Sequence, residues 1–348
     1  MADEVKVAEK TETVESLRKI DDNLRLPSVP ERRVFPKEID VSAARMQTPA
    51  VGQRVTRPDG RMHGLGQTKY IDDMFFPGMI HAKIKRAGIA HAKIKSIDVS
   101  EAEKMPGVMA TLIGSEIPVN SFGPSLQDQP LLADDVVRHA GDGVAAVAAV
   151  TEQQALDALE KIKIVYEELP NVFDPVEAMK DDAYKIHNNE SNIYASKTII
   201  KGDVEKGFAD SDFIFERTFS TQMVEHVPME PHASIGEWDA NGRVTLHSSL
   251  GRITLGRADI SRTLEMPINR IRIIATVVGG NFGGKNEITT EPIVALLSKK
   301  TGRPVKCVFT REDEFISSTT RHPFVMEYKT GMSKEGKIMA RKVRLICD

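Results

Sequence analysis

The stretch IRIIATVVGGNFGGKNEITT, residues 271–290, runs from a β-branched strand into a glycine-rich loop and then into the start of a helix. Gly279, Gly284 and Lys285 satisfy the pattern G-x-x-x-x-G-K of nucleotide-binding P-loops. The next residue is Asn286, where that motif requires serine or threonine. The loop therefore raises the question of which ligand its glycines are meant to approach.

The composition indicates a folded chain of two or three domains, because it has 348 residues of which 41% are hydrophobic. A net charge of -3, from 47 basic and 50 acidic residues, supplies no global field that would collect nucleic acid or acidic membranes. The N-terminus has no apolar signal core, and no run approaches the roughly 18 apolar residues of a membrane span. Cys307 and Cys347 stand far apart in no metal-ligand spacing, which favours a reducing compartment, by default the cytoplasm.

Changes in polarity and residue pattern divide the sequence into three parts. Residues 1–50 are polar and without sustained periodicity, so we expect an extended N-terminal arm. Residues 51–175 carry short β-rich runs and form a first predicted domain. Residues 176–348 form a second one, which begins with a polar connection and becomes globular near residue 195.

The clearest secondary structure is GVAAVAAVTEQQALDALEKIKIVYEEL, residues 143–169. Its small apolar residues predict a buried strand, and Thr151 with Gln154 predicts a capping box at the start of a helix. The apolar stripe of that helix is Ala155, Ala158, Leu159 and Ile162. A second strand follows, and we interpret the whole segment as a β-α-β unit.

The second region predicts hairpins and two helices. Asn241–Gly242 predicts a hairpin turn, and Lys334–Gly336 predicts another one before a strand with clean alternation. Helices are expected at residues 255–266 and 289–300, the second ending at Gly302. These antiparallel signals disagree with the alternating βα units and parallel sheet of a P-loop fold.

The final segment KVRLICD, residues 342–348, still supports nucleotide binding, because it resembles the apolar strand ending in an aspartate that binds magnesium in P-loop proteins. We keep a P-loop protein as the less favoured alternative. The chain also stops in mid-strand at Asp348, and we expect either a gene split into subunits or an incomplete product.

The sequence HAKIK occurs twice, at residues 81–85 and 91–95. In strand geometry its lysines and its apolar residues face opposite sides, which predicts two half-buried strands with solvated lysine faces. No aromatic residues interleave with the lysines to stack bases, so we predict no nucleic-acid binding.

The segment QMVEHVPMEPH, residues 222–232, gathers Glu225, His226, Glu230 and His232. Its histidines are not spaced to share a helix face, and its prolines oppose a helix, so direct metal ligation is not favoured. We predict a turn that locks polar side chains in a buried loop.

Taken together, residues 52–348 resemble the molybdenum-cofactor-binding large subunit of the xanthine dehydrogenase and aldehyde oxidase family. The resemblance rests on motifs in the family's order: the two HAKIK strands with residues 143–169, then EHVPMEPH, VGGNFGGK and TREDEFISSTTRHPFVMEYKTG. It implies an α+β fold, in which a hammerhead domain precedes the first part of a molybdopterin-binding domain.

The resemblance also gives the glycine loop a role, since in this family the loop approaches the molybdenum centre. The implied cofactor-binding residues are Gly280, Phe282, Gly283 and Gly284. The backbone N–H of Phe282 would lie near an oxygen or sulfur ligand of the metal, with no direct metal ligand from this chain. The alternative is a core phenylalanine under a glycine turn.

Some positions depart from the family pattern. The xanthine-oxidising members place a glutamate directly after the lysine, whereas this chain has Asn286 and then Glu287, so these two are candidate substrate contacts and xanthine is not favoured. A glutamine that faces the metal is expected near Leu250 and Gly251, where none occurs. The family's catalytic glutamate would lie beyond Asp348, so no residue is nominated as the base.

The implied reaction is hydroxylation of an N-heterocycle or an aldehyde with oxygen derived from water. The implied cofactor is molybdenum bound to molybdopterin or to its cytosine dinucleotide form, with iron–sulfur clusters and FAD on partner subunits. A further polypeptide would supply the rest of the molybdopterin domain. A non-catalytic assembly module that docks the iron–sulfur and flavin subunits is the alternative function.

Overall fold

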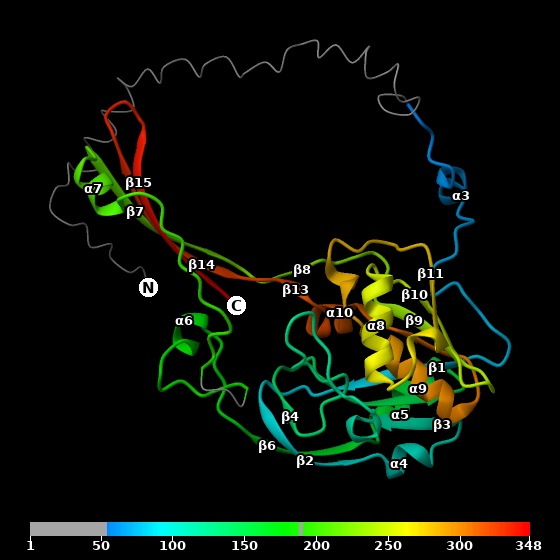
Figure 1. Cartoon of the computed structure of the whole chain (residues 1–348). Coiled ribbons are helices and arrows are strands. Elements are labelled where there is room, and N and C mark those ends of the chain that lie inside the picture. The colour runs from blue at the N-terminus through cyan, green and yellow to red at the C-terminus, as the bar shows by residue number, and fades with distance from the viewer. Residues whose placement is uncertain (1–53, 188–190) are drawn as a thin grey trace. The chain divides into compact units, whose positions relative to one another are not determined.

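The computed structural model describes residues 54–187 and 191–348 (Figure 1). The chain divides into two units between Gln67 and Thr68. The expected arm at residues 1–50 lies outside the described residues. Within the first unit the described residues form one short helix, α3 (Gly60–Gly64). All further elements belong to the second unit.

A mixed seven-stranded sheet is the centre of the second unit. Its strands, in spatial order, are β11 (Ile271–Ala275), β10 (Val244–Ser248), β9 (Ala233–Trp238), β12 (Val305–Val308), β1 (Ile80–Arg86), β5 (Gly143–Ala149) and β3 (Val108–Ile113). The parallel pair of β1 and β12 aligns Ile80 with Val305. Three strands thus come from the region before residue 176 and four from the region after it, so both regions share one sheet.

Helices cover both faces of this sheet, and they are α9 (Glu291–Thr301) and α5 (Glu152–Leu159). Along β5, Ala146 and Ala148 belong to the large core that includes α9, whereas Ala145 and Val147 pack with the α5 side. Because successive strand residues point to opposite faces, a strand covered on both sides must be apolar throughout. This explains why its sequence shows no alternation.

The capping box predicted for α5 is confirmed. The hydroxyl of Thr151 accepts from the Gln154 backbone N–H at 3.2 Å, and the Gln154 side chain accepts from the Thr151 N–H at 3.1 Å. The predicted β-α-β unit is wrong, however, because the next strand, β6 (Lys163–Glu168), joins a separate sheet with β2 (Ala92–Asp98) and β4 (Val136–Val137). Polar residues alternate along β6, so it covers a core with one face only.

The two HAKIK repeats differ in burial. In β2 the lysines Lys93 and Lys95 are exposed, as predicted. In β1 the prediction is wrong, because Lys83 is only 4% exposed. Its Nζ lies 2.6 Å from a carboxylate oxygen of Glu152 and donates to the Val308 carbonyl at 2.9 Å. Lys83 is buried because α5, a separate element of the tertiary structure, covers that face of β1.

A third sheet contains β15 (Ile338–Cys347), β14 (Phe324–Met332) and β7 (Phe213–Thr221), with α7 (Val204–Ala209) packed against it. The hairpin turn expected at Lys334–Gly336 joins β14 to β15 and is confirmed. The remaining α-helices and strands are α4 (Ser100–Glu103), α6 (Pro175–Ala178), β8 (Val224–Glu225) paired with β13 (Thr320–Arg321), α8 (Ile253–Thr263) and α10 (Arg311–Ser317). The helices expected at residues 255–266 and 289–300 are α8 and α9. Across the described part of the chain, no helix has the length and apolar content to cross a membrane.

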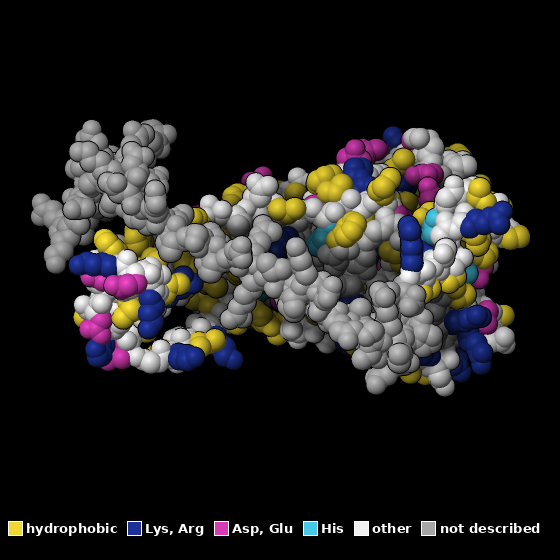
Figure 2. Space-filling model, turned by 90° about the horizontal axis from the view of Figure 1, so that it is seen from above, with side chains coloured by type: hydrophobic (Ala, Val, Ile, Leu, Met, Phe, Trp, Pro, Cys, Tyr) yellow, Lys and Arg dark blue, Asp and Glu magenta, His cyan; other side chains and the backbone are white. Residues whose placement is uncertain are grey.

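Large hydrophobic side chains remain exposed on the described surface (Figure 2), and several of them share one face of the third sheet. Met326 pairs with both Phe219 and Leu345, and side chains directly opposite one another point the same way. We call the apolar residues of this face the apolar sheet face: Phe213, Phe215, Phe219, Met326, Tyr328, Val343 and Leu345. Arg217 and Arg341 lie on the same side of the sheet. The opposite face alternates with it and carries charged residues, among them Glu216, Glu327, Lys329 and Arg344, together with the buried Ala340 and Ile346.

Replacing Lys83 by alanine should lower the free energy of unfolding by about 1.5–3 kcal/mol, because it removes charge-assisted hydrogen bonds from a buried position. The matched control is Lys93→Ala, at the same place in the exposed repeat, where a change within about 0.5 kcal/mol is expected. Urea unfolding of both variants measures the difference. Equal losses would contradict the burial of Lys83.

Candidate functional site

At one edge of the seven-stranded sheet β11 and β12 end and β9 begins, and the segments next to these strand ends form the candidate site. In register, Ala275 at the end of β11 aligns with Ser248, Ser248 with Ser234 near the start of β9, and Val308 at the end of β12 with Ala233. The glycine loop leaves β11, the EHVPMEPH segment enters β9, and α10 follows β12. Segments far apart in the sequence therefore meet at this edge.

The glycine loop has an unusual backbone. Its φ angle is 112° at Gly280, 53° at Phe282 and 98° at Gly283. Positive φ is easy for glycine but uncommon for phenylalanine, where it stores strain. The Phe282 side chain is 73% exposed, so the alternative of a core phenylalanine is wrong.

The amide groups of this loop divide into two sets. Those of Gly283, Gly284 and Lys285 donate to the side chain or carbonyl of Asn281, at 2.9, 2.8 and 3.3 Å. Those of Gly280, Asn281 and Phe282 donate to no acceptor among residues 54–187 and 191–348. Successive free N–H groups in a turn with positive φ suit the binding of an anion.

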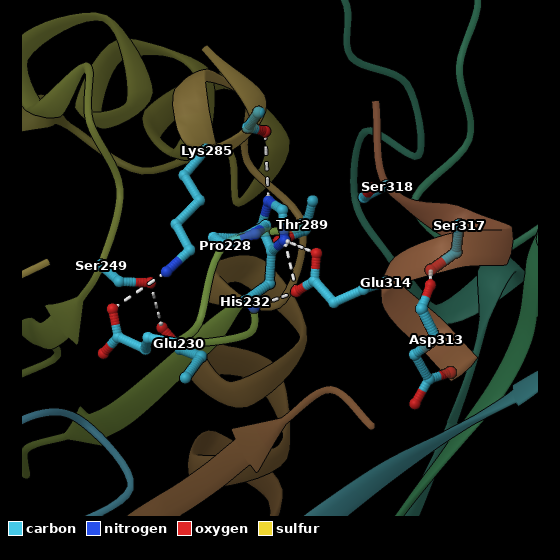
Figure 3. Close-up of polar contacts among 12 residues, drawn as sticks. Pro228, Glu230, His232, Ser249, Lys285, Thr289, Asp313, Glu314, Ser317 and Ser318 are labelled. Atoms are coloured by element: carbon cyan, nitrogen blue, oxygen red, sulfur yellow. Dashed lines mark hydrogen bonds and ion pairs between the residues drawn. The ribbon is translucent and has the colours of Figure 1, made fainter. Parts of the chain in front are cut away.

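Glu230 ties the two ends of the loop together. Its Oε2 accepts from the Lys285 Nζ at 2.9 Å (Figure 3) and from the Gly279 N–H at 2.8 Å. Its backbone N–H donates to the Gly279 carbonyl. Lys285 is 1% exposed, and this burial lowers its pKa, against the opposing effect of the Glu230 hydrogen bond. A lysine that anchors the loop internally cannot reach a nucleotide phosphate, so the P-loop alternative is wrong.

His232 and Glu314 form a second buried pair beside the loop (Figure 3). The His232 Nδ1 lies 2.9 and 3.1 Å from the two carboxylate oxygens, and its Nε2 lies 3.2 Å from the Gly284 carbonyl oxygen. Burial would raise the pKa of Glu314, but the hydrogen bonds and charge of His232 outweigh it and lower the pKa. The prediction that EHVPMEPH locks polar side chains in a buried loop is thereby confirmed at Glu230 and His232.

The two candidate substrate contacts follow the loop and face different surroundings. Glu287 bonds Gln129, and its Oε2 is buried without a partner among the described residues. Burial raises the pKa of Glu287 against the opposing charge of Arg252. Asn286 stands beside Gly251. A substrate contact at either residue stays a prediction.

The structure also shows the surroundings of Leu250 and Gly251, near which the family's metal-facing glutamine is expected. Leu250 is 4% exposed and packs against Gly256 of α8, so its side chain belongs to the core. The N–H of Gly251 donates to the Lys285 carbonyl at 2.6 Å, which brings this segment beside the loop. A Cβ on Gly251 would lie 1.9 Å from the Asn281 amide nitrogen, so a side chain there would require the Asn281 amide to move.

Two residues of the site, Glu314 and Thr319, were not predicted from the sequence. The Thr319 hydroxyl donates to the Gly284 carbonyl at 3.1 Å. Glu314 belongs to the acidic run at residues 312–314, and nothing in the sequence marks which of its carboxylates turns inward. In the sequence, Glu314 and Thr319 were marked only by lying within the family motif that begins TREDEF. In the described part of the chain, no three His, Cys, Asp or Glu side chains gather as a metal site would require.

Comparison with known proteins agrees with this architecture. Residues 65–170 match the model of the aldehyde oxidase and xanthine dehydrogenase a/b hammerhead domain, and residues 186–348 match that of the molybdopterin cofactor-binding domain. The chain is 38% identical over 293 residues to a probable xanthine dehydrogenase subunit of Bacillus subtilis, covering 84% of this chain but 39% of that protein. It is 36% identical over 299 residues to the nicotinate dehydrogenase large molybdopterin subunit of Eubacterium barkeri, covering 86% of this chain and 70% of that protein.

The fold is also similar to a solved structure, the aldehyde oxidoreductase from Desulfovibrio gigas. The TM-score is 0.81 at 29% sequence identity, and the match covers 85% of this chain and 34% of that one.

The buried pair predicts a pH effect on stability. Because the pKa of Glu314 lies below its ordinary 4.5 in the folded chain, its ionised form stabilises the fold above that pH, and this contribution is lost as the pH falls. Glu314→Gln should lower the free energy of unfolding by about 1–3 kcal/mol near pH 7 and by less near pH 3.5. The control is Glu312→Gln, exposed on the same helix. A loss that is independent of pH, measured by urea unfolding, would contradict the ionised pair.

Proposed function

Because the chain belongs to the xanthine dehydrogenase and aldehyde oxidase family of molybdopterin-binding subunits, we propose that it is part of a molybdenum hydroxylase. The enzyme would hydroxylate an N-heterocycle or an aldehyde with oxygen derived from water. The observation that carries the proposal is the row of free N–H groups at Gly280, Asn281 and Phe282, held in a loop whose two ends are bound by Glu230.

The residues present fit an anionic pterin cofactor. The three free N–H groups would donate to its oxygen or sulfur atoms, while the exposed ring of Phe282 offers an apolar surface beside them. Gly283 needs its positive φ, and a Cβ on Gly284 would meet the His226 ring at 3.0 Å. When bound, the molybdenum centre supplies the redox chemistry that oxidises the substrate. This chain's part is to bind and orient that group.

Asn286 and Glu287, which follow the loop directly, are the proposed substrate contacts. A carboxyl group whose pKa is raised by burial, as at Glu287, keeps a proton to a higher pH than an exposed one and can then donate a hydrogen bond. An N-heterocycle or an aldehyde offers acceptors for such a donor.

Partner polypeptides are part of the proposal. The apolar sheet face leaves Phe219 at 53% and Leu345 at 56% exposure, which favours a covering segment. We assign that role to the remaining part of the molybdopterin domain, whether on this polypeptide or on another. Iron–sulfur and FAD subunits would carry the electrons away. Both cysteines are free thiols, consistent with a cytoplasmic location.

Gly283→Ala tests whether the glycine loop binds the cofactor, in the complex that this chain forms with its partner subunits. A Cβ forces strain at a φ of 98°, and a shift of about 1 Å at the bound group can reduce turnover on the order of a hundredfold. The control is Gly302→Ala, also at positive φ in open space, which should cost only about 1 kcal/mol of stability. Bound molybdenum, pterin content and turnover are measured. A wild-type complex without molybdenum would overturn the proposal and favour the non-catalytic assembly module.

Phe219→Lys tests the covering segment. The isolated chain should self-associate through the apolar sheet face, and a charge on that face should reduce the association. Thr218→Lys is the matched control, since the neighbouring residue points to the opposite face. Sedimentation of the three proteins gives the comparison. Identical behaviour would mean that this face attracts no partner.

A further inference from the structure

The ring of His232 faces oxygen atoms on both sides. On one side its Nδ1 meets the carboxylate of Glu314 at 2.9 and 3.1 Å, and on the other its Nε2 meets the carbonyl of Gly284 at 3.2 Å (Figure 3). A carbonyl can only accept hydrogen bonds, and so can an ionised carboxylate. With Glu314 ionised, both ring nitrogens donate and His232 is an imidazolium whose charge Glu314 balances, whereas a neutral ring would require Glu314 to carry the proton.

The surroundings of this pair support two charges. His232 is 5% exposed and Glu314 is 0% exposed, so neither group is solvated by water. Glu314 accepts a further hydrogen bond, from the backbone N–H of His232. The other charged group that acts on Glu314 is Lys285, which is paired with Glu230. Arg311, which acts on Lys285, donates to the backbone carbonyls of Pro228 and Met229 instead of to a carboxylate. The charges of His232 and Lys285 are therefore each balanced by a carboxylate, as burial requires.

The His232–Glu314 pair contacts the glycine loop at Gly284, which is not one of the three residues with free amides. Gly284 has its carbonyl held by two donors, the His232 Nε2 and the Thr319 hydroxyl. Its own N–H closes the turn on the Asn281 carbonyl. Since that turn also contains Phe282, the direction of the Phe282 N–H depends on where Gly284 is held.

We propose that His232, protonated on both ring nitrogens and paired with Glu314, is a positioning residue for the cofactor loop. It holds Gly284 so that the N–H groups at Gly280, Asn281 and Phe282 keep the direction in which they bind the anionic cofactor. The role rests on the proposed function, because it needs a cofactor at this loop. Neither His232 nor Glu314 touches the reacting atoms.

Two double variants separate positioning from folding. His232→Leu with Glu314→Leu removes the donor to Gly284 without leaving a buried charge, so folding should survive. His232→Gln with Glu314→Gln is also uncharged but keeps an N–H near the Nε2 position. In the assembled complex, the leucine pair should lower bound molybdopterin or kcat by about tenfold or more, with little change in KM, as a small misplacement predicts. The glutamine pair should recover most of the loss.

Nitrogen NMR of ring-labelled histidine in the same complexes reads the charge state directly. The His232 signals, identified by their absence in the glutamine pair, should show hydrogen on both ring nitrogens at about pH 7.5. A singly protonated ring would overturn the proposal, as would a leucine pair with unchanged molybdopterin and kcat. A wild-type complex without molybdenum would instead overturn the proposed function, and the positioning role with it.

Discussion

The carboxylate of Glu230 is the interaction on which the site depends. It accepts hydrogen bonds from the Gly279 N–H and the Lys285 Nζ, and so joins the two ends of the glycine loop. Burying two charges is unfavourable unless both are well satisfied, and here the ammonium and carboxylate satisfy each other. With its ends saturated in this way, the loop can leave the amides in its middle free. A phosphate loop would use the same lysine in the opposite manner, pointing outward to the ligand.

The site is built on a sheet that both sequence regions share. The strand β1, from the first region, lies between β12 and β5, and its pairing with β12 continues the sheet into the second region. The segment that follows β12 carries Glu314, and the segment that enters β9 carries His232. The strand ends that carry the His232 pair therefore belong to a sheet whose strands β1, β5 and β3 come from the first region.

Local features were predictable because they depend on neighbouring residues. The capping box at Thr151, the hairpin turn before β15 and the glycine end of α9 need only a few consecutive residues, and the structure contains each of them. Predictions that depended on distant covering elements were the ones that failed. The lysine of the first HAKIK repeat is buried because α5 lies over it, and β6 leaves the sheet of β5 because its alternation suits a different core.

By itself the sequence determined which residues form the loop and that its glycines allow positive φ, since both follow from residue type. It also marked Glu230 and His232 as part of one polar segment. Only the tertiary structure decided their partners, Lys285 for Glu230 and Glu314 for His232. His232 and Glu314, 82 positions apart, meet because β9 begins and β12 ends at one edge of a sheet, and no local pattern encodes such a meeting.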